Sequence, residues 1–147
     1  MKRRQMLCAL ASAAGLGFLP RAALARSSIA FGELYSGSSV LGLTFSEKLK
    51  SLEGKKVSIQ GFMAPPLKAD AAFLVLTSEP VSLCPFCNSD QDWPDNIIVV
   101  WLENRQDFVQ ANRLIEVTGT LELGSKTDEE TGFVSLVRLV DARFEVR

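Results

Sequence analysis

The chain has 147 residues, of which 47% are hydrophobic, and its 16 basic and 17 acidic side chains give a formal net charge of −1. It contains no histidine, which excludes the Ser-His-Asp triad and leaves thiols, carboxylates and the backbone as the groups for any chemistry. The length fits about one domain.

Residues 1–25 have the pattern of an export signal. A basic start, Lys2-Arg3-Arg4, precedes an apolar run over residues 6–19, and Ala23-Leu24-Ala25 supplies a small-x-small cleavage sequence. The run is shorter than the roughly 20 apolar residues that a membrane span requires. The paired arginines favour the twin-arginine export route over the general secretory one. We therefore expect a periplasmic or otherwise exported protein that is cleaved near Ala25.

Cleavage at this position changes the charge of the protein. The signal carries four basic residues and no acidic one, so the remaining 12 basic and 17 acidic side chains give a net charge of −5. An acidic surface argues against nucleic acid and anionic membranes as partners. We expect a protein partner and no stable insertion of the mature chain into a membrane.

The mature chain is predicted to begin with a flexible arm over residues 26–43, which is rich in glycine and serine, followed by a single domain over residues 44–147. Thr44 and Glu47 have the spacing of a capping box, in which the Thr hydroxyl accepts from a first-turn amide and the Glu carboxylate reaches back. An apolar stripe follows, and Gly54 provides a stop signal. A short helix over about residues 45–52 is therefore expected.

After this helix the hydrophobic pattern changes to a period of two, which is typical of strands. The predicted strands cover residues 57–63, 71–77, 96–102, 115–123 and 134–146. A helical turn is expected within 103–112. Gly61 and Gly119 fall inside strands, where glycine suits the tight bends of small barrels. The sequence thus predicts an all-β fold with small α content: a five-stranded antiparallel OB-like barrel with one short N-terminal helix. A small β-sandwich is the alternative.

Four short motifs are similar to those of one group of bacterial proteins. They are Gly61-Phe62-Met63-Ala64-Pro65, Phe73-Leu74-Val75-Leu76, Cys84-Pro85-Phe86-Cys87 and Val117-Thr118-Gly119. Over about residues 45–146 the chain resembles an uncharacterised family of exported OB-like proteins with a Cys-Pro-Phe-Cys loop. The resemblance implies an exported OB-like domain, and some members are associated with transporters and metal homeostasis. It implies no catalytic residue.

The segment that begins with Cys84 and Cys87 carries the most specific chemical signal, because Cys8 is expected to leave with the signal. A structural disulfide is the simplest hypothesis, since exported proteins meet an oxidising compartment. The loop that it would close contains only four residues, so chain entropy would contribute only about 2 kcal/mol. Such a bond would fix the loop, as part of a structural interaction module, more than it would stabilise the fold.

A thiol–disulfide oxidoreductase is the second hypothesis, because Cys-x-x-Cys with an inner proline occurs in thioredoxin-like proteins. That chemistry requires a thiol with a depressed pKa, which is usually placed at the start of a helix. Here Asp90, Asp92 and Asp95 follow the pair, and no basic residue lies between Lys68 and Arg105. Nearby carboxylates disfavour a thiolate, so the local charges argue against this hypothesis.

Metal binding is the third hypothesis, and the same carboxylates favour it. Two thiolates with carboxylates can form a tetrahedral zinc site, and two thiolates alone can hold monovalent copper. The predicted ligands are Cys84, Cys87, Asp90 and Asp92. Two aromatic residues of the segment, Phe86 and Trp93, are predicted to contact a partner.

The sequence therefore favours a binding protein over an enzyme. The predicted function is that of a non-enzymatic exported accessory protein in metal homeostasis or transport, which uses the Cys-x-x-Cys/Asp loop and holds zinc or copper. The oxidoreductase and the structural module with a disulfide-pinned loop remain the alternatives. Trp101, within an apolar predicted strand, is expected to belong to the core.

Overall fold

A computed structural model describes residues 26–66, 72–82 and 93–147. In chain order its elements are β1 (Ser27–Ser28), the 3-10 helix η1 (Phe31–Glu33), β2 (Tyr35–Ser39), β3 (Gly42–Phe45), α1 (Glu47–Leu52), β4 (Lys56–Met63), β5 (Phe73–Thr77), β6 (Ile97–Leu102), β7 (Leu114–Thr127) and β8 (Val134–Val146). The predicted all-β class with a small helical content is confirmed. Within the described ranges, neither helix is long and apolar enough to cross a membrane.

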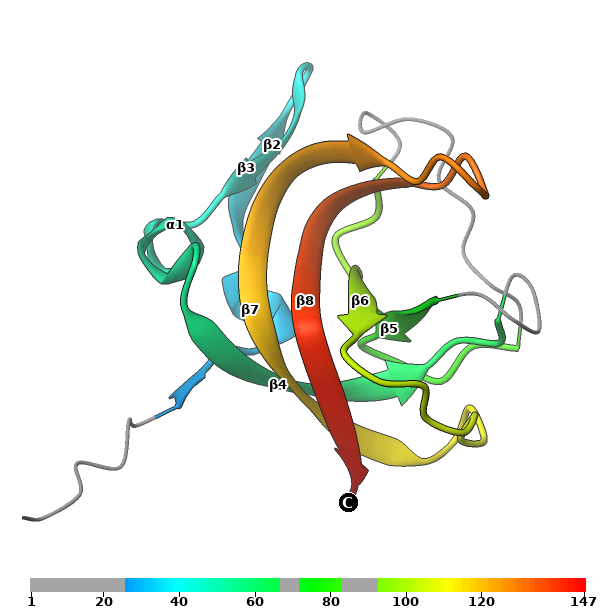
Figure 1. Ribbon diagram of the computed structural model, residues 1–147. Helices are drawn as coiled ribbons and strands as arrows, with labels where there is room; N and C mark the ends of the chain where they lie inside the picture. Colours follow the sequence, from blue (N-terminus) through cyan, green and yellow to red (C-terminus); the bar gives the residue numbers. More distant parts are fainter. Residues whose placement is uncertain (1–25, 67–71, 83–92) are drawn as a thin grey trace, which may run out of the picture.

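Five of the strands pair in a closed ring. The order is β4, β5, β6, β8, β7, and β7 returns to pair with β4 (Figure 1). Four of these pairs are antiparallel, but β6 and β8 run parallel. The predicted purely antiparallel order is therefore wrong. The reason is geometric: strand direction cannot alternate around a closed ring that has an odd number of members, so at least one neighbouring pair must be parallel.

The two long strands, β7 and β8, curve strongly along their length (Figure 1). The pairing of β8 with both neighbours shifts by one residue around Asp141, which has a positive φ of 48°. Such an inserted residue is a β-bulge, which bends a strand. Gly119 lies opposite this bulge, and a Cβ there would stand 2.8 Å from Ala142 Cβ and 2.9 Å from the Val140 carbonyl oxygen. Only glycine allows this close approach without a shift of β8.

The core lies inside the ring and extends beneath the N-terminal elements. Strands β5 and β6 are buried along almost their entire length, as expected for apolar segments without alternation. Leu34 and Leu49, which precede the ring in the chain, are fully buried in the same cluster. Burial of a side chain of this size stabilises a fold by about 1.5–3 kcal/mol.

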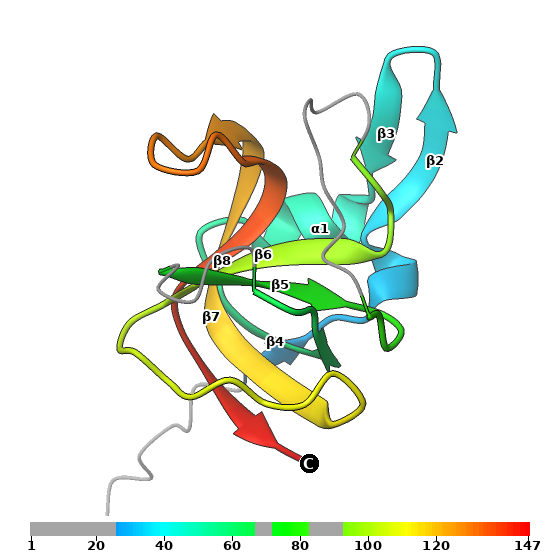
Figure 2. The same ribbon diagram turned by 90° about the vertical axis from the view of Figure 1, so that its right-hand side faces the viewer.

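The segment 26–43, expected as a flexible arm, contains regular structure. Strand β1 pairs in parallel with β4, and the Ile29 amide donates to the Ser58 carbonyl at 3.0 Å. Strands β2 and β3 then form an antiparallel hairpin that projects from the ring, with Val40 and Leu41 exposed at its tip (Figures 1 and 2). The first part of the segment 26–43, before the hairpin, is thus packed on the ring, because Ile29 and Leu34 are buried there.

Two local predictions are corrected by tertiary contacts. The helix cap is Ser46, whose hydroxyl accepts from the Leu49 amide at 3.0 Å, whereas Thr44 pairs with Gly37 inside the hairpin. The segment 103–112, in which a helical turn was predicted, forms no helix; a single hydrogen-bonded turn follows at its end, where the Arg113 amide donates to the Gln110 carbonyl at 2.9 Å. Instead, the side chain of Gln106 accepts from the Phe144 amide and donates to its carbonyl, which holds this segment along β8.

Candidate functional site

The cysteine segment belongs to the connection between β5 and β6. Five predicted site residues fall outside the described residues, and their ligand and contact roles remain predictions. They are Cys84, Phe86, Cys87, Asp90 and Asp92. The structure describes both ends of this connection, residues 78–82 and 93–96, and therefore shows how the segment is attached to the ring.

The base of this connection is closed by hydrogen bonds. The Ser78 amide donates to the Asn96 carbonyl at 3.0 Å, directly beyond the last β5–β6 pair, Thr77 and Ile97. The hydroxyl of Thr77, a fully buried residue, lies 2.6 Å from the Glu79 carbonyl oxygen and 3.1 Å from that of Phe62. The connection therefore leaves the ring from a fixed position.

Trp93, which was predicted to contact a partner, is the predicted site residue that the structure does describe, and it is buried and not exposed on the surface. The residue is only 4% exposed and belongs to the core cluster. Its indole nitrogen donates to the Tyr35 hydroxyl at 2.9 Å, and the Tyr35 ring stacks on Phe45 with centroids 6.0 Å apart. Trp93 thus anchors the end of the cysteine segment against the β2–β3 hairpin, because its indole can be buried once the N–H has an acceptor.

A shallow cavity of about 320 Å³ lies beside this anchor. Phe31, Tyr35 and Leu43 give it an apolar wall, and serines of the hairpin and Asp95 give it a polar rim. Asp95 is exposed, as is Glu79 on the opposite side of the connection's base. The described parts of the connection carry these two acidic residues and no basic one. Their charges favour a cation near the connection.

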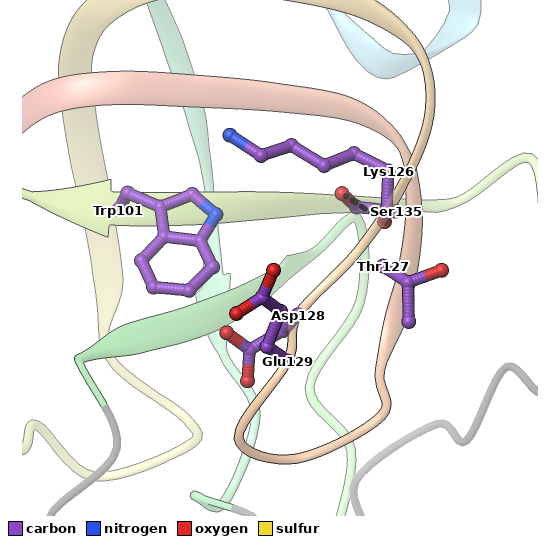
Figure 3. A pocket seen from close by; sticks show the side chains of 6 residues that line it. All are labelled: Trp101, Lys126, Thr127, Asp128, Glu129 and Ser135. Carbon is purple, nitrogen blue, oxygen red and sulfur yellow. Dashed lines mark hydrogen bonds between the residues drawn. The ribbon is translucent and has the colours of Figure 1, made fainter.

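A second cavity, of about 350 Å³, lies where β6 meets the turn between β7 and β8 (Figure 3). Its lining consists of Trp101, Lys126, Thr127, Asp128, Glu129 and Ser135. Trp101, expected to belong to the core, is partly buried and packs against the core from its edge, with its ring centroid 4.9 Å from that of Phe73. The cavity is not evident from the sequence, because residues 126–129 have the pattern of an ordinary polar turn and only the fold places them beside Trp101.

Neither cavity contains an obvious metal centre. Across residues 26–66, 72–82 and 93–147, no three Cys, Asp or Glu side chains stand close enough together to hold an ion. The proposed thiolate ligands lie outside these ranges, so this observation concerns the ring and the hairpin alone.

Comparison with known structures gives one informative likeness. A DUF3299 family protein from Pseudomonas aeruginosa PAO1 has a similar crystal structure, with a TM-score of 0.58 at 11% sequence identity. The match covers 84% of this chain and 97% of that one. At this identity the likeness concerns the fold alone. No protein-family model and no curated protein matches the chain.

Proposed function

We propose that this protein is a non-catalytic, exported binding protein, and that the segment containing Cys84 and Cys87 is its binding element. It would hold a thiophilic metal, zinc or monovalent copper, and act as an accessory to metal homeostasis or transport together with a protein partner. The observation that carries this proposal is the fixed base of the β5–β6 connection. A binding element on such a base loses less conformational freedom when its ligand arrives.

Three contacts support this role for the connection. The backbone bond between Ser78 and Asn96 closes its base, and the Thr77 hydroxyl holds the first turn beyond β5. The indole of Trp93 then secures the far end against the hairpin. The first two contacts fix the chain where it leaves β5, and the third fixes it shortly before β6, so both described ends of the connection are restrained.

The charges on the base favour metal binding over thiol catalysis. Glu79 and Asp95 are exposed on the described ends of the connection, and Asp90 and Asp92 lie within the segment itself. Carboxylates near a thiol raise its pKa and slow its attack on a disulfide, whereas they attract a cation and can complete its coordination.

The fold that we propose for the ring is an OB-like barrel. Counted along the chain, the five ring strands are β4, β5, β6, β7 and β8. The first, β4, pairs with the second and the fourth, β5 and β7, and the third and fifth, β6 and β8, run parallel. This is the strand order of that fold. OB folds place their ligand contacts on one sheet face and on the loops around it. A binding function of the β5–β6 connection agrees with that general arrangement.

Native mass spectrometry of the reduced protein with zinc or cuprous ions tests the metal proposal. We expect one metal adduct per chain, which disappears in Cys84→Ser and in Cys87→Ser because two thiolates are needed. Asp90→Asn and Asp92→Asn should weaken zinc binding. Asp107→Asn is the matched control, since Asp107 is exposed and lies outside the β5–β6 connection, and it should leave the adduct unchanged.

Two results would reject the proposal. The first is a protein that loses 2 Da on air oxidation and binds no metal after reduction, which would support the structural disulfide. The second is a Cys84 thiol that is alkylated near neutral pH much faster than a cysteine in an unstructured peptide. That result would support an oxidoreductase, since fast alkylation reports a depressed thiol pKa.

A further inference from the structure

We propose that the cavity between Trp101 and the β7–β8 turn is a second binding site, and that it takes a small zwitterion of the amino-acid class. Three features carry this proposal: an indole donor and an ammonium group that have no partner among the described residues, and two carboxylates on the same wall. The proposed site consists of described residues only, and it does not depend on the metal proposal.

The indole nitrogen of Trp101 is buried, and no described residue accepts its hydrogen bond. Figure 3 shows this nitrogen turned toward the side of the cavity where Lys126 and Asp128 lie. The other buried indole, that of Trp93, does have an acceptor, the Tyr35 hydroxyl. A buried donor without a partner is destabilising, and such an exception in a folded protein calls for a specific explanation. An acceptor atom of a ligand would satisfy the Trp101 donor.

Lys126 supplies a second donor. Its side chain extends across the cavity toward the Trp101 side (Figure 3). Among the described ion pairs and hydrogen bonds, none involves its ammonium group. Its backbone is fixed, because its carbonyl accepts from the Ser135 hydroxyl at 3.2 Å. Since the side chain is exposed and flexible, it can move aside to admit a ligand and then bind an acidic group of that ligand beside the indole.

The carboxylates come from a turn that is already ordered. The Asp128 amide donates to the Phe133 carbonyl at 2.8 Å, and Asp128 Oδ2 accepts from the amide and the hydroxyl of Thr131. These bonds occupy one oxygen of Asp128 and leave Oδ1 for another donor. Glu129 is exposed next to it on the cavity wall. The two side chains therefore form an acceptor pair for a cationic group.

These groups select the class of ligand by charge. A dicarboxylate would pair with Trp101 and Lys126 but would be repelled by Asp128 and Glu129. A diamine would pair with the carboxylates but leave the indole donor unsatisfied. A ligand with one carboxylate and one ammonium group can pair with the two donors and with the two carboxylates at once. The cavity volume of about 350 Å³ is large enough for a small molecule such as an amino acid.

The test follows the indole N–H resonance of Trp101 by NMR in the ¹⁵N-labelled protein, with the assignment taken from Trp101→Phe. The probes are L-alanine, L-leucine and L-glutamine, with succinate and putrescine for comparison. We expect a saturable downfield shift with at least one of the amino acids. The shift with succinate or putrescine should require at least tenfold higher concentration, because each of them satisfies one side of the cavity only.

Variants then separate this site from nonspecific binding. Lys126→Met and Glu129→Gln should each weaken the amino-acid response at least tenfold. Glu130→Gln, at the exposed neighbouring position that does not line the cavity, should leave it unchanged. The proposal is overturned if no amino acid moves the resonance, if the three variants respond alike, or if the indole proton shows only contact with a bound water that no probe displaces.

Discussion

Arg138, on β8, is a buried cation that pairs with a residue of β7. Its side chain is 7% exposed, and Nε donates to Glu122 Oε2 at 2.8 Å while Nη1 donates to the Gly124 carbonyl at 2.7 Å. We predict that Glu122→Ala lowers the free energy of unfolding by about 2–3 kcal/mol, because it leaves a buried charge without its counter-ion. The value lies below that of a fully buried pair because Glu122 is 40% exposed. Urea unfolding measures it.

The matched control for this prediction is an ion pair on the surface. Lys48 Nζ lies 2.7 Å from Glu33 Oε1, but both side chains are 45% exposed. Lys48→Ala should therefore lower the free energy of unfolding by less than about 1 kcal/mol. Adding Arg138→Met to Glu122→Ala should restore most of the lost stability, since an apolar replacement removes the uncompensated charge. Equal costs for Glu122→Ala and Lys48→Ala would show that the burial of Arg138 is energetically unimportant.

Single residues also show where reasoning from sequence neighbours fails. Trp93 lies between Asp92 and Pro94, a setting that indicates a surface loop, yet it is buried because its acceptor, Tyr35, lies 58 positions earlier in the chain. Gly61 and Gly119 were expected to allow tight bends. The structure shows a different need for glycine at both positions, because a Cβ there would stand less than 3.0 Å from atoms of the neighbouring strand.

At the scale of elements, the Trp93–Tyr35 bond joins the β5–β6 connection to the β2–β3 hairpin. We predict that Tyr35→Phe lowers the free energy of unfolding by about 1–3 kcal/mol, because the buried Trp93 indole loses its acceptor. Amide hydrogen exchange should also become faster at residues 93–97, where the connection enters β6. Hydrogen-exchange mass spectrometry with peptides that cover β6 and the hairpin measures both segments.

A second hairpin variant shows whether this effect is specific. Ser36→Ala removes only a long hydrogen bond, 3.5 Å, from the exposed Ser36 hydroxyl to the Thr44 carbonyl, and should change stability by no more than about 0.5 kcal/mol. If both variants alter the exchange of residues 93–97 equally, then the hairpin as a whole, and not the Trp93 bond, determines the order of the connection.

The elements themselves differ in how well the sequence predicts them. The five ring strands are recognisable in the sequence, because a period of two marks β4, β7 and β8 and continuous apolar runs mark β5 and β6. The β2–β3 hairpin was missed because Ser36-Gly37-Ser38-Ser39 has low strand propensity, and the hairpin forms through its pairing and the contacts of Tyr35. The helix cap was misplaced by two residues, since Thr44 and Ser46 are both good caps and only tertiary pairing decides between them.

For the molecule as a whole, the sequence indicates which segments are strands but not how they close. Periodicity reports the buried face of a strand and carries no information on its neighbours. Trp101 on β6 and Phe133 at the end of the β7–β8 turn both pack on Phe73 of β5, and this brings the turn close to Trp101, where the cavity lies. A site of this kind becomes visible only when the ring order is known, whereas the cysteine segment is visible in the sequence because its residues are contiguous.

The acid stability of the ring depends in part on Glu116. Its carboxylate accepts from the Gln60 side chain on β4 at 3.1 Å and from Arg147 beyond β8 at 2.7 Å. The bond from Gln60, and after it the bond and charge of Arg147, lower the pKa of Glu116 below its ordinary value of 4.5. A carboxyl group with a lowered pKa in the folded state contributes stability above its unfolded pKa and loses it as the pH falls.

We therefore predict that the melting temperature falls as the pH is lowered below about 4.5, and that Glu116→Gln reduces this fall because a neutral amide does not titrate. The measurement is thermal unfolding at pH 7, 5, 4 and 3. Glu103→Gln, at an exposed position just beyond β6, is the control and should keep the pH dependence of the parent protein. If Glu116→Gln and Glu103→Gln give parallel curves, the contacts that join β4, β7 and Arg147 through Glu116 make no net contribution to acid stability. The ring would then depend at low pH on its apolar core and backbone pairing, which do not titrate.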